Sequence, residues 1–212
     1  MHGVKHMADS PLGFPATLEV DYPERELNRL TTAFRLFTVI PILIILALLS
    51  GATGGTKHPL LQSGGLVVLP TVLMLLVRQK YPRWWFDWNL AFVRFNIRVS
   101  AYLALLRDEY PSTEEDQAVH LAIPYPDATH ELNRWLPLIK WFLAIPHYVV
   151  LVFLLVASVF CVIVAWFAIL FTGRYPRPLF DFVVGALRWS LRVTAYALLL
   201  TTDRYPPFRV TA

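Results

Sequence analysis

The segment with the greatest influence on the fold is an apolar stretch in the C-terminal third of the chain. It reads WFLAIPHYVVLVFLLVASVFCVIVAWFAILFTG, from Trp141 to Gly173, and it contains no charged residue. As one straight helix it would be about 50 Å long, whereas the hydrocarbon core of a bilayer is about 30 Å thick. We therefore expect this stretch to fold back on itself as a helical hairpin, with arms near 138–155 and 158–172.

The composition of the whole chain is typical of a membrane protein. Of its 212 residues, 56% are apolar and 16% are charged, and the mean hydropathy is +0.50. Soluble domains usually contain about 45–50% apolar and about 25% charged residues. The single cysteine, Cys161, lies inside an apolar run, which excludes a secreted fold held by disulfides. The net charge of +4 is too small to indicate nucleic-acid binding.

The same sequence pattern occurs twice. Glu26-Leu-Asn-Arg29 recurs as Glu131-Leu-Asn-Arg134, and Tyr81-Pro-Arg83 recurs as Tyr175-Pro-Arg177. Ordered matches of this kind predict two tandem structural repeats. The predicted organisation is an N-terminal cytoplasmic tail (1–25), a first membrane repeat (26–111), an acidic linker (112–130) with an extended segment at 119–123, a second membrane repeat (131–207) and a C-terminal tail (208–212).

A Gly-rich insertion separates the apolar arms of the first repeat. The stretch from Gly51 to Gly65 has no counterpart in the second repeat and is typical of a loop. It predicts a hairpin with arms near 34–50 and 65–79. The predicted fold class is therefore all-α integral membrane, with two tandem repeats. Each repeat is a transmembrane hairpin followed by an amphipathic interfacial helix, which gives about four membrane helices and two interfacial helices. The arms are short for a span of ~17–25 residues, so whether they cross fully stays open.

The third helix of each repeat, predicted near 84–106 and 179–201, carries one charged stripe. An Asp is followed at +7 and +11 by Arg, and the three positions lie within about 40° of one another on a helix. The helix could cross the bilayer with this stripe turned inward, at about 2.5–3.5 kcal/mol for each Arg. Alternatively, it could lie in the interface with its arginines at lipid phosphates. The stripe is either an anionic headgroup site or a polar contact between repeats, and its residues are Asp87, Arg94, Arg98, Asp181, Arg188 and Arg192.

The placement of the basic residues favours the interfacial alternative. If each repeat crosses twice, nearly all basic residues outside the stripe fall on one side, and only Lys57 and His58 lie opposite. The positive-inside rule then predicts a multi-pass protein with both termini cytoplasmic. Amphipathic rings prefer the membrane interface. The expected interface anchors are Trp84, Trp85, Trp88, Trp135, Trp141 and Tyr175.

No motif for catalysis, metal binding or nucleotide binding is found in the sequence. His147 could serve a haem or a proton relay, but the corresponding residue of the first repeat is Ile42, and anchoring at the interface is the simpler interpretation. We therefore expect no catalytic residue, no metal site, no cofactor and no nucleic-acid partner.

Several motifs of the second repeat resemble a known family. Ile145-Pro-His-Tyr148, Arg188-Trp-Ser-Leu-Arg-Val193 and Asp203-Arg-Tyr-Pro-Pro-Phe208 are similar to the bacterial membrane family catalogued as domain of unknown function 4389. The first repeat resembles it in a degenerate form, with Gln79-Lys80 in place of Gly173-Arg174. The resemblance implies a location in the bacterial inner membrane and brings no activity.

These observations predict a non-catalytic scaffold or accessory subunit of a membrane complex, not an enzyme. The alternative is binding of anionic phospholipid, or transport of a lipid or small molecule through a cavity between the repeats. The expected partners are membrane lipids, together with either a membrane protein or a second copy of the chain.

Overall fold

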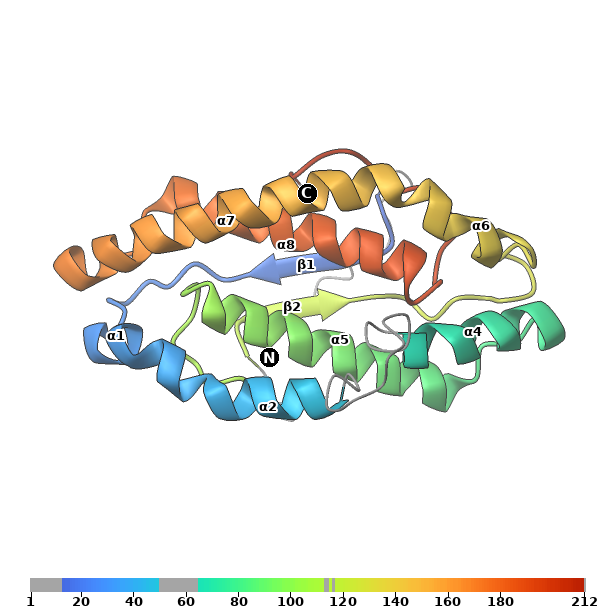
Figure 1. Ribbon diagram of the computed structural model, residues 1–212, viewed down its shortest axis with the longest axis horizontal. Helices are drawn as coiled ribbons and strands as arrows, with labels where there is room; N and C mark the ends of the chain where they lie inside the picture. The colour runs from blue at the N-terminus through green and yellow to red at the C-terminus, as the bar shows by residue number, and fades with distance from the viewer. Residues whose placement is uncertain (1–12, 50–64, 113–114, 116, 212) are drawn as a thin grey trace, which may run out of the picture.

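The computed structural model describes residues 13–49, 65–112, 115 and 117–211, and it is mostly helical with one two-stranded ribbon (Figure 1). Helices α6 and α7 lie along one long edge, and α1, α2 and α4 lie along the other. Helices α5 and α8 and the ribbon lie between these edges. The elements are β1 (Thr17–Val20), α1 (Arg29–Thr38), α2 (Ile40–Leu49), α4 (Gly65–Arg78), α5 (Arg83–Leu103), β2 (Val119–Ala122), α6 (Leu136–Leu143), α7 (Ile145–Thr172) and α8 (Arg177–Ala197).

The antiparallel ribbon connects the two halves of the molecule. Leu18 of β1 pairs with Leu121 of β2. Burial alternates along both strands, as a pleated strand requires, so that one face of the ribbon is buried and the other is exposed. β1 packs on α8 and β2 packs on α5, so each half supplies a strand to the core of the other. The extended segment predicted at 119–123 is confirmed, whereas the prediction of a plain tail over 1–25 missed β1.

The predicted hairpin of the second repeat is wrong. α7 is one continuous helix of 28 residues and passes through the expected turn near 156–157. No Gly or Pro interrupts the sequence between Pro146 and Gly173. Pro146 lies in the first turn, where its missing N–H costs no hydrogen bond. The helix ends at Gly173, whose φ is +73°.

The first repeat does not place its two apolar arms side by side either. α2 and α4 lie one after the other along their edge of the molecule, where a hairpin would have packed them together (Figure 1). The predicted loop lies outside the described residues apart from Gly65, which begins α4. Within the described part of the chain, α7 is the one helix long and apolar enough to cross a membrane. The four membrane helices that we predicted are therefore not found.

The third helix of each repeat is confirmed as a helix, and its position in a membrane interface stays a prediction. α5 and α8 each contain 21 residues and begin directly after Pro82 and Pro176. Pro disfavours a helical conformation in the residue before it, which separates these helices from α4 and α7. Both helices lie in the middle of the molecule. α8 is the more deeply buried of the two, since four consecutive residues from Val183 to Ala186 are buried, and it packs against α7 and β1.

Contacts at corresponding positions show that the two halves are built alike. The Tyr22 hydroxyl donates to the carbonyl oxygen of Tyr175 (2.5 Å), and Tyr125 donates in the same way to Tyr81. The backbone N–H of Asn28 donates to Asp108 (2.8 Å), and that of Asn133 donates to Asp203 (2.6 Å). These paired contacts, with Leu18 facing Leu121, relate the halves by an approximate two-fold axis through the ribbon.

Candidate functional site

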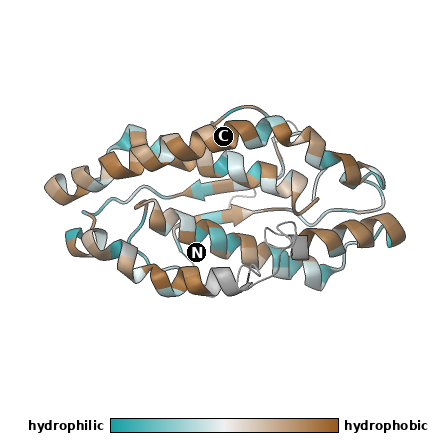
Figure 2. Cartoon of the chain, viewed as in Figure 1, coloured by the Kyte–Doolittle hydropathy of each residue, from teal (hydrophilic) through white to brown (hydrophobic). Residues whose placement is uncertain are grey.

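The most extensive apolar feature of the surface is the exposed side of α6 and α7. Phe153, Phe160 and Phe171 are 71%, 70% and 78% exposed, which is unusual for phenylalanine in water. Figure 2 shows that hydrophobic residues dominate α7. We call this surface the α7 face, and its large exposed side chains on α7 are Ile145, Tyr148, Val149, Val152, Phe153, Leu155, Val156, Val159, Phe160, Ile163, Val164, Phe167 and Phe171.

The opposite long edge is also apolar. Its exposed side chains come from α1, α2 and α4, and Leu30, Phe37 and Val77 are each about 70% exposed. The others are Phe34, Ile40, Leu43, Ile44, Leu69 and Leu73. A soluble monomer rarely exposes contiguous apolar patches of this kind, which mark a surface that contacts protein or lipid.

The arginines of the predicted stripe bind backbone carbonyl groups. Arg188 donates from Nε to the carbonyl oxygen of Leu18 in β1 (2.8 Å), and therefore joins the two halves. Arg192 donates to the carbonyl oxygens of Arg209 (3.0 Å) and Thr211 (2.7 Å). Arg98 donates to that of Ser112 (2.5 Å). Arg98 and Arg192 are buried, and Arg94 is half-buried. Three of the four arginines thus hold the chain together.

The aspartates of the stripe lie apart from its arginines. Asp87 and Asp181 are exposed, and neither forms an ion pair with another described residue. The reason is axial distance, because seven residues rise about 10.5 Å along a helix. A shared angular position therefore does not bring the Asp and the Arg together. Contact of the stripe with lipid headgroups stays a prediction.

Each half contains a buried cation that was not predicted as a site residue. Lys140 is fully buried, and its Nζ lies 2.7 Å from Oδ1 of Asp203 and 2.8 Å from the carbonyl oxygen of Thr202. Arg35 is buried and pairs with Asp108, and it donates to the carbonyl oxygens of Tyr102 and Arg107, both at 2.9 Å. Burial lowers the pKa of Lys140, and the hydrogen bond and charge of Asp203 oppose this shift. The repeated basic residue at 35 and 140 was the signal in the sequence.

Two residues expected at a membrane interface lie in the interior. Tyr175 is 1% exposed, and its ring packs edge-on against Phe180, because the turn before α8 directs it into the core. His147 is fully buried and stacks on Phe208 with 4.1 Å between ring centroids. Nδ1 of His147 accepts a hydrogen bond from Nε1 of Trp189 (3.1 Å). Assigning Tyr175 and His147 as interface anchors was wrong.

The tryptophans are mostly placed as anchors need to be. Trp84 and Trp135 are 69% and 65% exposed, and Trp88 and Trp141 are also exposed. Trp85 is half-buried and donates to Oγ1 of Thr71 (2.8 Å). The indole rings of Trp85 and Trp88 stack on each other. The role of all five tryptophans at a lipid interface stays a prediction.

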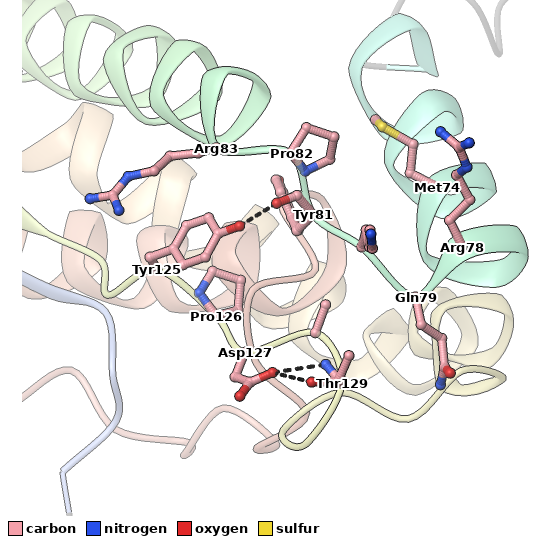
Figure 3. A pocket seen from close by; sticks show the side chains of 12 residues that line it. Met74, Arg78, Gln79, Tyr81, Pro82, Arg83, Tyr125, Pro126, Asp127 and Thr129 are labelled. Carbon is pink, nitrogen blue, oxygen red and sulfur yellow. Dashed lines mark hydrogen bonds between the residues drawn. The ribbon is translucent and has the colours of Figure 1, made fainter.

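Two open cavities occupy corresponding places at the joints between the halves. One of about 610 Å³ lies between the end of α4 and the segment that follows β2 (Figure 3). The other, of about 400 Å³, lies between Tyr22–Leu27 and the Arg174–Tyr175 turn. In the first cavity, Thr129 and His130 donate hydrogen bonds to Asp127 and lower its pKa. Arg78 and Arg83 point in different directions, so the cations do not converge on one anion.

Comparisons with known proteins give one match. Residues 135–209 match the family model described as Domain of unknown function (DUF4389). The DUF4389 match covers α6, α7 and α8, and it confirms the resemblance of the second repeat, in one copy. No curated protein and no solved structure matches the chain. In the described part of the chain, no group of three His, Cys, Asp or Glu side chains could hold a metal ion. The DUF4389 segment therefore contains the exposed apolar surface of α7, and the description of the family names no activity.

Proposed function

We propose that this protein is a non-catalytic scaffold or accessory subunit of a membrane complex, held in the bilayer by its α7 face. The observation that carries the proposal is α7 itself, a helix of 28 residues without a charged side chain and with a row of exposed large apolar residues. Each Å² of apolar surface removed from water contributes about 25 cal/mol, so transfer of this face into lipid is strongly favourable.

The use of the polar side chains supports a structural role. Arg188 ties α8 to the ribbon, Arg192 ties it to the C-terminal segment, and Lys140 ties α6 to the residues after α8. In many enzymes, buried or half-buried ionisable side chains such as these act as acids, bases or ligands of the substrate. Here their hydrogen bonds go to backbone carbonyl groups of the same chain, and Lys140 also pairs with the carboxylate of Asp203. This arrangement stabilises a rigid body and leaves its apolar surfaces for interaction.

The finer features of the proposal follow from the repeat. We take the first half to be a second, divergent copy of the DUF4389 unit, because its contacts correspond to those of the second half. The proposed location is the bacterial inner membrane, with both termini on the cytoplasmic side. The proposed partners are anionic lipids, together with a membrane protein or a second copy of the chain.

The test is membrane association of a variant that carries charges on the α7 face. Phe153→Lys with Phe160→Lys places two cations at positions that are 71% and 70% exposed, so the fold should tolerate them. We expect the variant to leave the membrane fraction on alkaline extraction while the wild type stays. The control is Glu24→Lys with Glu115→Lys, two exposed positions off this face, which should behave as wild type. Wild-type protein that is extracted by alkali, or that is monodisperse in water without detergent, would refute membrane insertion.

The scaffold role needs a second measurement. In mild detergent, the wild-type protein should co-purify with a stoichiometric membrane protein or as a defined oligomer. A chain that purifies alone and monomeric from native membranes contradicts this part of the proposal, even if the α7 face proves to be in lipid.

A further inference from the structure

We infer that the molecule lies flat within one leaflet, with α7 parallel to the membrane plane and with the exposed face of the β1–β2 ribbon toward water. This inference rests on the proposed function, because it specifies how the α7 face meets lipid. By length and composition alone, α7 could equally cross the bilayer.

The first argument comes from the position of the ribbon. It lies within the length of α7 and not beyond either of its ends (Figure 1). Its outer face carries Glu19 and His120, both exposed, and His120 contacts Asp21 (3.3 Å) with both side chains about 60% exposed. If α7 crossed the bilayer, these groups would lie at the depth of the hydrocarbon, where exposed ionisable side chains and open strand edges are strongly disfavoured.

The second argument comes from the approximate two-fold axis. The axis relates α7 to α2 and α4, and the chain runs in opposite directions along the two edges (Figure 1). In a crossing arrangement, corresponding basic residues such as Arg29 and Arg134 would lie on opposite sides of the membrane. With the axis along the membrane normal, they lie at one depth. The flat arrangement therefore keeps the basic residues of both halves on one side of the membrane, whereas a crossing arrangement divides them between the two sides.

The third argument is the length of α7. Its 28 residues extend about 42 Å, well beyond the ~30 Å hydrocarbon core. A helix that lies in the plane of the leaflet does not have to match this thickness. Its exposed apolar side then faces acyl chains along its entire length, while its other side packs on α8.

The test is the immersion depth of three labels on one line of α7. Val149, Phe160 and Phe171 are exposed, and their spacing of 11 residues keeps them within about 40° on the helix while they span about 33 Å. In a Cys161→Ser background, each is replaced in turn by Cys, spin-labelled and reconstituted into vesicles of phosphatidylethanolamine and phosphatidylglycerol. Collision rates with oxygen and with a water-soluble nickel chelate then report depth.

The flat arrangement predicts equal depth for the three labels in the acyl region, and strong nickel collisions for control labels at Glu19 and His120. A crossing helix predicts a deep label at Phe160 with shallow labels at Val149 and Phe171. That result overturns the inference and leaves the proposed membrane role intact. Three labels in water would refute both. Unchanged tryptophan fluorescence of each labelled variant shows that the fold is retained.

Discussion

The first and second halves of this protein make the same closing contacts with different residues. Arg35 and Asp108 form the buried ion pair of the first half, with Arg35 over the ring of Tyr102. Lys140 and Asp203 form that of the second half, with Lys140 over Tyr196. The halves diverge along their outer edges, where continuous α7 stands opposite the separate helices α2 and α4. The contacts that position the central helices are thus less variable between the halves than the exposed apolar edges.

The largest expected effect comes from removing the carboxylate of an ion pair. Asp203→Ala leaves Lys140 fully buried with one backbone acceptor, and should lower the free energy of unfolding by about 3 kcal/mol or more. Asp108→Ala should cost less, because Arg35 keeps two backbone acceptors. Denaturation in detergent micelles, followed by tryptophan fluorescence, measures both. Asp181→Ala, at an exposed aspartate without an ion pair in the described chain, is the control, and an equal loss there would contradict the argument.

A second comparison exchanges His147 with the residue that corresponds to it, Ile42. Ile42 packs among Val39, Val99 and Tyr102, which offer a histidine ring little polar contact. Ile42→His should therefore cost about 2–3 kcal/mol of unfolding free energy. His147→Ile removes the acceptor of the Trp189 indole and the stacking on Phe208, while an apolar side chain still fills the site, and should cost about 1–2 kcal/mol. The same denaturation measurement gives the unfolding free energy of both variants. Equal costs would contradict the argument that the two sites differ in their polar contacts.

The sequence allowed prediction of the features that depend on local patterns. Local residue patterns predicted the two Tyr-Pro turns and the helices that follow them. They also predicted the extended segment at 119–123. The ribbon partner β1 was missed, because four residues pair with a strand about a hundred positions away. The hairpin in the second repeat was predicted from membrane thickness, whereas the backbone follows the absence of helix breakers between Pro146 and Gly173. The pairs Arg35–Asp108 and Lys140–Asp203 depend on tertiary contacts that spacing does not reveal.

The charged stripe offers a third comparison, between Arg188 and its counterpart Arg94. Arg188 bonds to the carbonyl oxygen of Leu18, and its replacement by Ala should cost about 1.5–2 kcal/mol of unfolding free energy. Arg94 is half-buried and makes no such hydrogen bond to β2 in the described chain, so Arg94→Ala should cost less than about 0.5 kcal/mol. Native mass spectrometry of both variants separates the two roles of the stripe. Loss of bound anionic lipid from Arg94→Ala without loss of stability would assign lipid binding to the first half.

A fourth comparison concerns the ends of α4 and α7. Gln79 and Gly173 occupy corresponding positions, and both have a positive φ, of 47° and 73°. A side chain in this conformation costs about 1 kcal/mol relative to glycine, so Gln79→Gly should raise the free energy of unfolding by up to about 1 kcal/mol. Gly173→Ala should lower it by at least as much, since the added Cβ would also lie 3.2 Å from a carboxylate oxygen of Glu26. If Gln79→Gly raises the free energy of unfolding and Gly173→Ala lowers it, the two halves share a left-handed backbone conformation at this position. Only the second half then has glycine, the residue that this conformation favours. Equal signs would show that the turn after α4 relaxes independently of the one after α7.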